Sequence, residues 1–329
     1  MALRIGIVGL GGIGNVHAGV YQNDELSEIV AVCDIIKERA DLAAEKYKAR
    51  PFYSVQEMLA SGIELEACSM CTAGKENGGD HYTPTMELLE AGLPVLGEKP
   101  ISNEIEKGRE MVALAKKKKL PYAVNLNHRF TPAALRARQW VDEGRLGKLH
   151  ILNMTMWINN PNETSPWFHL RALHPHSIDV MRYFGGNVKS VHAFLMKGEG
   201  RKIWSNAQIN MLFENDVVGH LTGSYDAGGT FGLERCEVVG SKGRFVLEDA
   251  CEILAWYPRF GIERETYYHL GGMPSFGDTF PSRLHKWLEQ LTQGVKPEDV
   301  DGSGADALAA QEIIEAAIKS WENHSVVDL

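Results

Sequence analysis

Short apolar runs alternate with segments of helical period along the first 127 residues. Apolar runs of this length predict strands, and the amphipathic segments between them predict helices. Strands are predicted at 4–8, 28–34, 51–53, around Cys68, 93–96 and 121–127; helices are predicted at 13–22, 37–48, 55–61, 83–92 and 104–119. Strands and helices that alternate at this spacing form a parallel sheet covered by helices on both faces.

The pattern changes from about residue 127. A helix at 132–143, a strand at 148–157 and an irregular stretch at 159–170 lead to a helix at 175–184. Further strands are predicted at 188–196, 206–213, 217–225, 234–240 and 243–249, with Gly240–Gly243 as a hairpin turn and a closing helix at 312–322. Residues 206–213 alternate polar with apolar side chains, which predicts a sheet with one face on a core and one open face.

The length of 329 residues allows two domains, and 44% hydrophobic with 23% charged residues is typical of a soluble globular protein. The net charge of -9 argues against nucleic acid and anionic membranes as partners. The basic run 116–119 ends a predicted helix, where cations complement the helix dipole. No apolar stretch is long enough to span a bilayer, and the start LRIGIVGL lacks a cleavable signal region.

Five cysteines, an odd number, suit a reducing compartment, so a cytoplasmic location is expected. Cys68 and Cys71 form a CxxC pattern within a predicted buried strand, where they point to opposite faces. A zinc site needs a second pair or spaced histidines, and a thioredoxin motif needs a following helix start. We interpret the pair as structural.

A glycine motif follows the first predicted strand and opens a predicted helix. The segment 9–14 reads GLGGIG, a GxGxxG pattern, and Asp34 ends the second strand 20 positions after Gly14. In this context the glycines let the backbone approach a pyrophosphate, and the acid binds the ribose hydroxyls. The first half, residues 1–125, is therefore predicted to be a Rossmann domain that binds a dinucleotide through Gly9, Gly11, Gly12, Ile13, Gly14 and Asp34.

Asp34 also bears on the choice of cofactor. A carboxylate accepts hydrogen bonds from a free 2′-hydroxyl and repels a 2′-phosphate, so NAD is favoured over NADP. Lys37 and Arg39 follow closely in the sequence, and these two cations are the residues that favour NADP.

Lys99 stands at the end of the stretch LPVLGEKPIS, where Pro100 stops a predicted strand just after Glu98. Ligands of open parallel sheets bind beyond the carboxyl ends of the strands, so a lysine there can meet a cofactor on one side and a substrate on the other. A lone lysine in a strand-to-loop corner can equally be a surface residue.

The order of these motifs resembles the Gfo/Idh/MocA family of oxidoreductases, which includes inositol, glucose and other sugar dehydrogenases. The resemblance spans essentially the whole chain and rests on GLGGIG, Asp34, CTAG, His81 before a helix ending in EAG, EKP, NHRF and HxxD at His176 to Asp179. It implies that Lys99 lies beside the nicotinamide and the substrate hydroxyl. Matching positions add Thr72, His81, Glu98, Lys99 and Asn127 to the expected cofactor contacts.

The resemblance also implies the fold and assembly of the second half. Residues 126–329 are expected to form an α+β domain with a large open, predominantly antiparallel sheet. In the family such a sheet carries helices on one face and often pairs subunits through the other, so a homodimer or homotetramer is expected.

His176 is the candidate acid–base residue. Histidine suits proton abstraction from an alcohol near neutral pH, Asp179 one helical turn on can orient its ring, and the family's catalytic histidine falls at this motif. A lone histidine is otherwise more often structural. His169 and His174 suggest a metal site as an alternative, but hydride transfer needs no metal and none is predicted.

Several further side chains are candidate substrate contacts, each with an alternative role in packing or at a domain interface. The expected substrate-binding set is Lys99, Asn127, Arg129, Trp157, Trp167, Arg171, His174, His176 and Asp179. Among Asn127, Arg129, Trp157, Trp167 and Arg171, only Asn127 and Arg129 are further supported as substrate contacts, because they match the family's pattern after EKP.

The segment before His176 departs from the family pattern D-x-G-x-H-x-x-D. Ala172 stands where the acid that positions the substrate hydroxyl is usual, and His174 stands where glycine is usual. The loop 73–80 is longer than the common form, and Asn125 replaces a frequent glycine. The predicted cofactor-binding half therefore follows the family pattern, whereas the segment expected to bind the substrate departs from it.

These observations predict an NAD-dependent dehydrogenase that oxidises a secondary alcohol of a polyol, inositol, sugar or sugar derivative. Two alternatives stay open: an enzyme that keeps NAD bound and oxidises its substrate transiently to assist elimination, and a non-catalytic sensor of NAD or sugar. Ala172, in the place of the usual acid, favours the sensor. The presence of both Lys99 and His176 favours an enzyme.

Overall fold

The computed structural model describes residues 2–227, 233–249, 253–268 and 276–329. The chain forms two compact units, the first made of residues 1–125 with 280–308 and the second of residues 126–279 with 309–329. A single boundary after residue 125 does not describe this division, because the segment 280–308 packs in the first unit.

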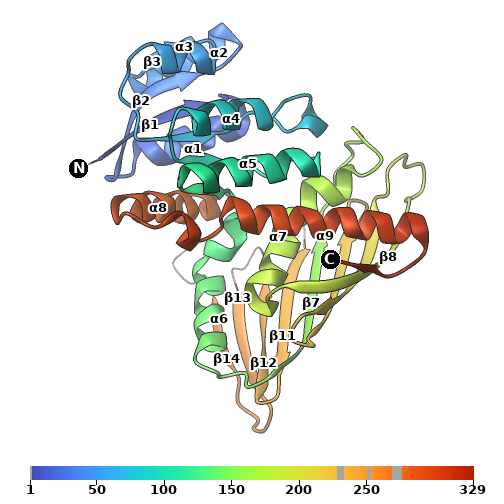
Figure 1. The fold of residues 1–329 in the computed structure, drawn as a ribbon. Helices are drawn as coiled ribbons and strands as arrows, with labels where there is room; N and C mark the ends of the chain where they lie inside the picture. The colour runs from blue at the N-terminus through green and yellow to red at the C-terminus, as the bar shows by residue number, and fades with distance from the viewer. Residues whose placement is uncertain (1, 228–232, 250–252, 269–275) are drawn as a thin grey trace. The chain divides into compact units, whose positions relative to one another are not determined.

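The first unit is built on a six-stranded parallel sheet, as the alternating pattern predicts (Figure 1). Its strands, in spatial order, are β3 (Arg50–Phe52), β2 (Ser27–Cys33), β1 (Leu3–Val8), β4 (Ala67–Met70), β5 (Val95–Gly97) and β6 (Tyr122–Val124). The order reverses between β1 and β4, and ligands of such sheets bind outside the carboxyl ends at this switch point. Gly9, Cys71 and Glu98 each follow directly from one of the strands that end there.

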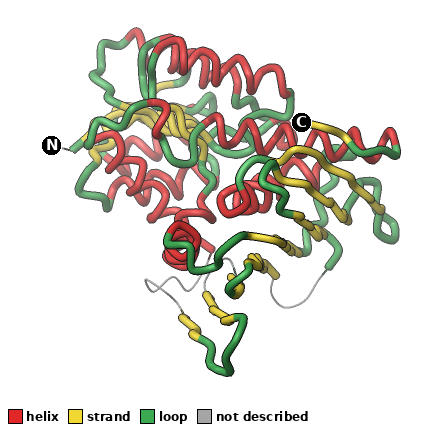
Figure 2. The backbone as a smooth tube through the Cα atoms, turned by 60° about the horizontal axis from the view of Figure 1, so that its bottom comes forward, coloured by secondary structure: helices red, strands yellow, loops and turns green. Residues whose placement is uncertain are grey.

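Five helices connect these strands, and Figure 2 shows helices on both sides of them. They are α1 (Gly12–Gln22), α2 (Lys37–Tyr47), α3 (Val55–Ala60), α4 (Tyr82–Glu90) and α5 (Ile105–Lys118). Ser54 caps α3 by accepting a hydrogen bond from the Glu57 N–H at 3.1 Å, as its position before the helix predicts. The last turn of α5 carries three lysines, which complement the carboxyl end of the helix dipole.

Helix α8 (Thr279–Thr292) returns to the first unit, which the sequence analysis did not predict. Leu284, Trp287 and Leu288 pack into the apolar cluster that also contains Ile5 and Ile7 of β1. Their spacing places them on one helix face, so the sequence could have predicted the helix. It could not have predicted that this helix packs in the first unit.

The described strands of the second unit form a nine-stranded sheet, and among them β7 and β10 are the one parallel pair. In spatial order its strands are β14 (Glu265–Tyr268), β13 (Ile253–Pro258), β12 (Gly243–Glu248), β11 (Leu233–Gly240), β7 (Leu149–Trp157), β10 (Val218–Ser224), β9 (Asn206–Phe213), β8 (Val188–Met196) and β15 (Val327–Asp328). The predicted predominantly antiparallel sheet is confirmed, including the hairpin between β11 and β12. Strands β13, β14 and β15 were not predicted.

Helices α6 (Pro132–Asp142) and α7 (Phe168–Gly185) pack on one face of this sheet (Figure 1). Helix α9 (Gly304–Asn323) adds Ile313, Ile314 and other apolar residues to the same core. Short 3₁₀ turns lie at η1 (Lys75–Asn77), η2 (Asn127–Phe130), η3 (Phe276–Asp278) and η4 (Pro297–Asp299). Thr131 caps α6 and Pro132 begins it, which fits the preference of proline for the first helical position.

Helix α7 begins seven residues before the predicted start at Pro175. Pro175 lies inside the helix, where it offers no N–H to the Arg171 carbonyl. Packing of the buried Leu170, Leu173 and Ile178 in the core outweighs that loss. As a result His169, Arg171, His174, His176 and Asp179 all lie on one helix.

The cysteines Cys33, Cys68, Cys71 and Cys236 are buried free thiols, and Cys251 lies outside the described residues. Burial raises the pKa of Cys68 to about 12, which fits the structural interpretation of the CxxC pair. Among the helices described, none combines the length and apolar character needed to cross a membrane.

Candidate active site

The turn after β1 needs glycine at two positions because the backbone closes on itself. Gly9 has a φ of +88°, and a Cβ on Gly14 would lie 1.9 Å from the Gly9 carbonyl oxygen. A Cβ on Gly11 or Gly12 would meet nothing within 4 Å, so these two border open space. The predicted GxGxxG turn is therefore tightly closed at Gly9 and Gly14 and open at Gly11 and Gly12.

The first N–H groups of α1, like those of any helix, have no partners inside the helix itself. Gly11 at the N-cap makes no side-chain capping bond, and the first turn contains no acidic residue. Such an end offers N–H donors and a positive dipole to an anion. With the open side above Gly11 and Gly12, it fits the pyrophosphate of a dinucleotide.

Asp34 is held beside this turn by both of its carboxylate oxygens. Oδ2 accepts the Leu10 N–H at 2.7 Å, and Oδ1 accepts the Ile36 N–H at 2.8 Å. Each oxygen keeps a second acceptor site, which suits the hydroxyls of a ribose. Lys37 directs its Nζ over the Tyr53 ring at 4.9 Å, so this cation is engaged within the described fold. These residues fit NAD.

His81 joins the loop after β4 to the turn after β5. Its Nδ1 lies 2.8 Å from the Pro100 carbonyl and its Nε2 lies 2.9 Å from the Thr72 carbonyl. The Thr72 hydroxyl donates to the Asp80 carbonyl at 2.7 Å. Thr72 and His81, both predicted cofactor contacts, thus fix the loop that adjoins Lys99.

Glu98 and Lys99 extend from the carboxyl end of β5 over a buried polar cluster. Glu98 Oε1 lies 2.9 Å from His17 Nε2 and accepts the Asn125 side-chain N–H at 2.6 Å, and its Oε2 accepts the Lys99 backbone N–H at 3.3 Å. His17 Nδ1 lies 2.7 Å from the Ser69 hydroxyl. The side chains that flank the predicted lysine are therefore locked in one arrangement.

Burial and pairing shift the pKa values in this cluster. Burial disfavours the charged His17 ring, but Cys71 and Glu98 beside it outweigh burial and raise the pKa of His17 to about 10. Burial opposes ionisation of Glu98, yet the bonds from His17 and Asn125 lower its pKa. Burial lowers the pKa of Lys99, against the opposing pull of Glu98.

His17 was missed by the sequence analysis. It lies three residues after Gly14, so its position in α1 aims it at the strands beneath the glycine turn, where it is fully buried. A histidine at this spacing, facing β4 and β5, was the available signal.

In the second unit, His176 stacks against His128 of η2. The two ring centroids are 4.2 Å apart and the planes meet at 23°. His128 Nδ1 lies 2.8 Å from Oε1 of Glu234 on β11. His176 is 5% exposed and His128 is 3% exposed, so the two imidazoles form a largely buried pair. Neither His128 nor Glu234 was predicted as a site residue.

Asp179, one turn after His176, accepts two hydrogen bonds from Arg129, one of them from Nε at 2.8 Å. The sequence analysis expected Asp179 to orient His176, which stays a prediction; in the structure Arg129 is a bidentate partner of this carboxylate. Asn127 donates its side-chain N–H to the Thr279 hydroxyl. Arg129 and Asp179, expected to touch substrate, brace η2 against α7.

His169 and His174 form a second buried pair with one consistent direction of hydrogen bonding. His169 Nδ1 faces the Trp204 carbonyl, which can only accept; its Nε2 lies 3.0 Å from His174 Nε2; and His174 Nδ1 lies 3.0 Å from the Ser177 hydroxyl. Burial lowers the pKa of His169 to about 4 and that of His174 as well, so both rings are neutral near pH 7. These contacts make His174 a packing residue beneath β10, where a Cβ on Gly223 would strike its ring.

The two tryptophans and Arg171 have described contacts of their own in the second unit. Trp157 lines a groove on the open face of the sheet with Phe194, Gln208 and Thr222, whereas Met156, its neighbour in β7, contacts Ser177 of α7. Trp167 stacks on Trp204 at 6.1 Å, and Arg171 makes a bidentate pair with Glu315 of α9.

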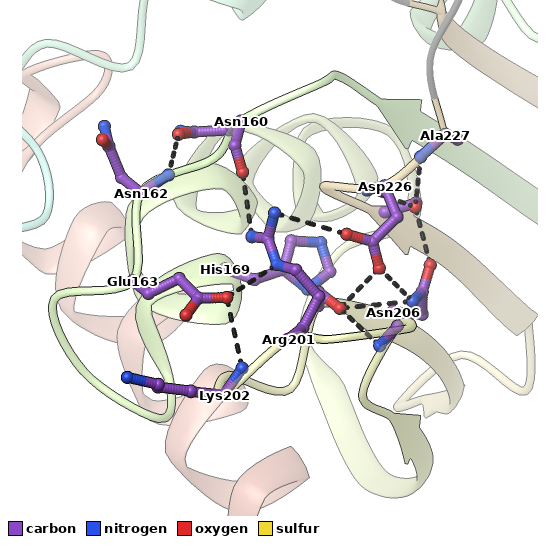
Figure 3. Close-up of polar contacts among 12 residues, drawn as sticks. Asn160, Asn162, Glu163, His169, Arg201, Lys202, Asn206, Asp226 and Ala227 are labelled. Carbon is purple, nitrogen blue, oxygen red and sulfur yellow. Dashed lines mark hydrogen bonds and ion pairs between the residues drawn. The ribbon is translucent and has the colours of Figure 1, made fainter.

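Arg201 anchors the irregular stretch before α7 (Figure 3). Its guanidinium lies 2.9 Å from Glu163 and 3.5 Å from Asp226, and it donates to the Asn160 carbonyl at 2.9 Å. Asp226 also accepts from Asn206 at 2.7 Å. This network holds residues 160–163 against the end of the sheet.

Within the part of the chain that the structure describes, no group of three or more His, Cys, Asp or Glu side chains is arranged to hold a metal ion. The first unit offers an ammonium at the edge of a dinucleotide-type sheet, and the second unit offers a largely buried pair of imidazoles.

Comparison with known proteins agrees with both halves of this description. Residues 3–126 match the family described as "Oxidoreductase family, NAD-binding Rossmann fold", and residues 134–246 match the "GFO/IDH/MocA C-terminal domain". The chain is 22% identical to an inositol 2-dehydrogenase of Rhizobium meliloti, over 97% of each protein. It is 25% identical to a myo-inositol 2-dehydrogenase of Thermotoga maritima, over 99% of this chain and 98% of that protein.

A solved structure of levoglucosan dehydrogenase with NADH and levoglucosan has the same fold, with a TM-score of 0.87 at 21% identity, covering 100% of this chain and 99% of that one. The predicted family, fold class and cofactor are thus confirmed. With a glycine turn and Asp34 that fit NAD, the chain belongs to the Gfo/Idh/MocA family of NAD-binding oxidoreductases.

Proposed function

We propose that this protein oxidises a secondary alcohol of a polyol, inositol, sugar or sugar derivative, with His176 as the acid–base residue and Lys99 as the residue that stabilises the alkoxide. The observation that carries the proposal is the placement of Lys99 at the carboxyl end of β5, in the same sheet edge as the glycine turn and Asp34. The names of the relatives, which act on inositols and levoglucosan, support the substrate class.

In the oxidation, the alcohol O–H bond breaks and its proton passes to a ring nitrogen of His176. The carbon that bore the hydroxyl gives up its hydride and becomes a carbonyl carbon. Lys99 donates a hydrogen bond to the oxygen while negative charge develops on it. NAD, when bound, supplies the acceptor for the hydride. Gly9–Gly14 and Asp34 would hold the cofactor at the edge of the sheet.

The test is reduction of nicotinamide by the purified protein on a panel of inositols, aldoses, anhydrosugars, amino sugars and sugar phosphates, with NAD and NADP separately. Turnover with NAD on at least one member is expected. Silence on every member, with NAD released when the protein is denatured, would replace the dehydrogenase with an enzyme that keeps its cofactor. Silence with measurable NAD affinity and no retained cofactor would favour the sensor.

Replacing Asp34 with serine is expected to weaken NAD binding and to narrow the gap between NAD and NADP. The substitution removes the charge that repels a 2′-phosphate, and Lys37 and Arg39 lie close in sequence to attract one. Losing hydrogen bonds to a charged group costs about 1.5–3 kcal/mol, so Kd for NAD should rise about 10- to 150-fold. Titration calorimetry with both cofactors measures this. An unchanged preference for NAD would show that Asp34 does not select the cofactor.

We infer that two copies of the chain associate through the open face of the nine-stranded sheet. Large apolar side chains are exposed there: Phe194 is 57% exposed, Met196 58% and Val218 51%. Phe194 and Met196 border a groove of about 380 Å³ that Trp157 and Thr222 also line. A second copy is the occupant that fits, because a sheet offers the same flat patch to a two-fold partner and exposed apolar area of this kind marks an interface.

Changing both Phe194 and Met196 to lysine is expected to convert the assembly to smaller species at micromolar concentration. The reason is that each lysine would place a charge in a desolvated interface. Light scattering after size-exclusion chromatography reads out the mass. Leu42→Lys, at a side chain 61% exposed on α2, is the matched control. A wild-type protein that is monomeric at this concentration would contradict the inference.

A further inference from the structure

Glu234 is a buried carboxylate on the side of the large sheet that faces the helices. Along β11, Glu234, Cys236 and Val238 are buried, and the latter two belong to the apolar core, whereas Arg235 and Glu237 alternate to the other face. Glu234 is only 7% exposed. Removing a carboxylate from water is costly unless the group is paired, so packing alone does not account for a glutamate here.

His128 is the partner of Glu234. Its Nδ1 lies 2.8 Å from Oε1, and because a carboxylate accepts, Nδ1 carries the proton in this contact. The bond reaches from a 3₁₀ turn to a strand 106 residues further along the chain. It fixes both the tautomer and the plane of the His128 ring.

The fixed ring of His128 lies flat against His176. The ring centroids are 4.2 Å apart, so a positive charge on either ring lies close to the other ring. The carboxylate of Glu234 is hydrogen-bonded to one of these rings. It therefore stands next to the positive charge that appears when His176 accepts a proton.

Several charged or titratable groups near His176 have described partners of their own. Arg129 and Asp179 neutralise each other, His169 and His174 bond to one another, and Arg138 of α6 pairs with Asp142. The described inner positions of the strands packed against α7 are otherwise uncharged: Leu152, Met154 and Met156 of β7, Gly219, Leu221 and Gly223 of β10, and Ala207, Ile209, Met211 and Phe213 of β9. Glu234 is thus the one charged side chain among the described inner positions of β7, β9, β10 and β11, and it is hydrogen-bonded to His128.

We propose that Glu234, acting through His128, is a positioning residue that sets the ring plane and the proton affinity of His176. The inference rests on the proposed function, in which His176 takes the alcohol proton. Stacking on His128 holds the His176 ring, and the carboxylate stabilises the charge that the ring acquires.

The first test is an NMR titration of ¹³C-labelled histidines in the full-length protein, with the His176 signal assigned by its loss in His176→Gln. Glu234→Gln keeps the shape and removes the charge, so the apparent pKa of His176 should fall by about one unit or more. Glu237→Gln is the matched control, because Glu237 lies on the same strand but pairs with Arg235 and Arg244 on the other face, and should leave the titration unchanged. If Glu234→Gln does not fold, Glu234→Met is the second variant, with the same fall expected.

An unchanged His176 titration in the Glu234 variant would overturn the proposal. The second readout is the pH profile of kcat/KM on a substrate found in the panel. A base with a lower pKa loses its proton at lower pH, so the acidic limb should move to lower pH and the plateau should fall about 10-fold or more, as for a weaker general base. A lower plateau without movement of the limb would mean that Glu234 is merely structural.

The two proposals can fail separately. If the wild-type protein reduces no nicotinamide on the panel but the NMR shift occurs, the proposed function fails and the coupling of Glu234 to His176 stands. If the wild type turns over a substrate but neither the His176 titration nor the acidic limb moves in the Glu234 variant, the proposed function stands and the role of Glu234 fails.

Discussion

Replacing Lys99 with methionine is expected to lower kcat about 10²- to 10³-fold, the usual cost of losing one donor to a developing oxyanion. Methionine keeps the length of the side chain and removes its charge. The loss should be large because Lys99 is partly withdrawn from water at the end of β5, where charge is poorly screened. Initial rates of NADH formation at saturating NAD and substrate measure it.

The Lys99 prediction requires that the variant still fold and bind NAD. The cluster beneath it, with Glu98 bonded to His17 and Asn125, does not use the Lys99 side chain in these bonds, so the Kd for NAD and the melting temperature should stay close to wild type. Lys107→Met is the matched control, because this half-buried lysine of α5 pairs with the N-cap residue Glu104. A Lys99→Met protein with wild-type kcat would remove Lys99 from the reaction.

Replacing His176 with glutamine should lower kcat/KM about 10²- to 10⁴-fold, the range that a positioned general base contributes. Glutamine can still form hydrogen bonds but cannot take a proton near neutral pH. The acidic limb of the pH profile should disappear together with the rate, because the group that titrates is gone. Stopped-flow or steady-state rates between pH 5 and pH 10 provide the measurement.

His324→Asn serves as the control for His176, since this exposed histidine follows α9 and contacts Trp321. Its pH profile should match that of the wild type. Should His176→Gln keep more than a tenth of the wild-type rate with the acidic limb in place, the proton would have to pass to another residue. His128, stacked on His176, would then be the first candidate.

The first unit was predictable because its signals are local. A strand, a glycine turn and a helix in immediate succession form the cofactor turn, and the acid at the end of the next strand lies beside it because neighbouring strands run parallel. Even here the sequence analysis missed His17, whose role depends on Ser69 and Glu98 from two other strands.

The second unit was predicted less completely. Its open sheet follows from the alternation in β9, yet the return of α8 to the first unit and the early start of α7 follow from packing. Arg129, Arg171 and Asp179 were all named as candidate substrate contacts. The structure adds ion pairs between Arg129 and Asp179 and between Arg171 and Glu315, which the spacing of these residues could not reveal.

By itself the sequence determined the two kinds of sheet, the glycine turn with its acid, the family and the positions of Lys99 and His176. These depend on periodicity and on motifs a few residues long, which act through backbone geometry. Tertiary structure alone decided that Glu234 reaches His128, that His128 stacks on His176, and that His169 and His174 satisfy each other. Some of these partners are distant in the chain, and others lie near several residues at similar spacing that could have been partners instead. Burial penalises every unpaired polar group, so it decides which of the possible pairs form.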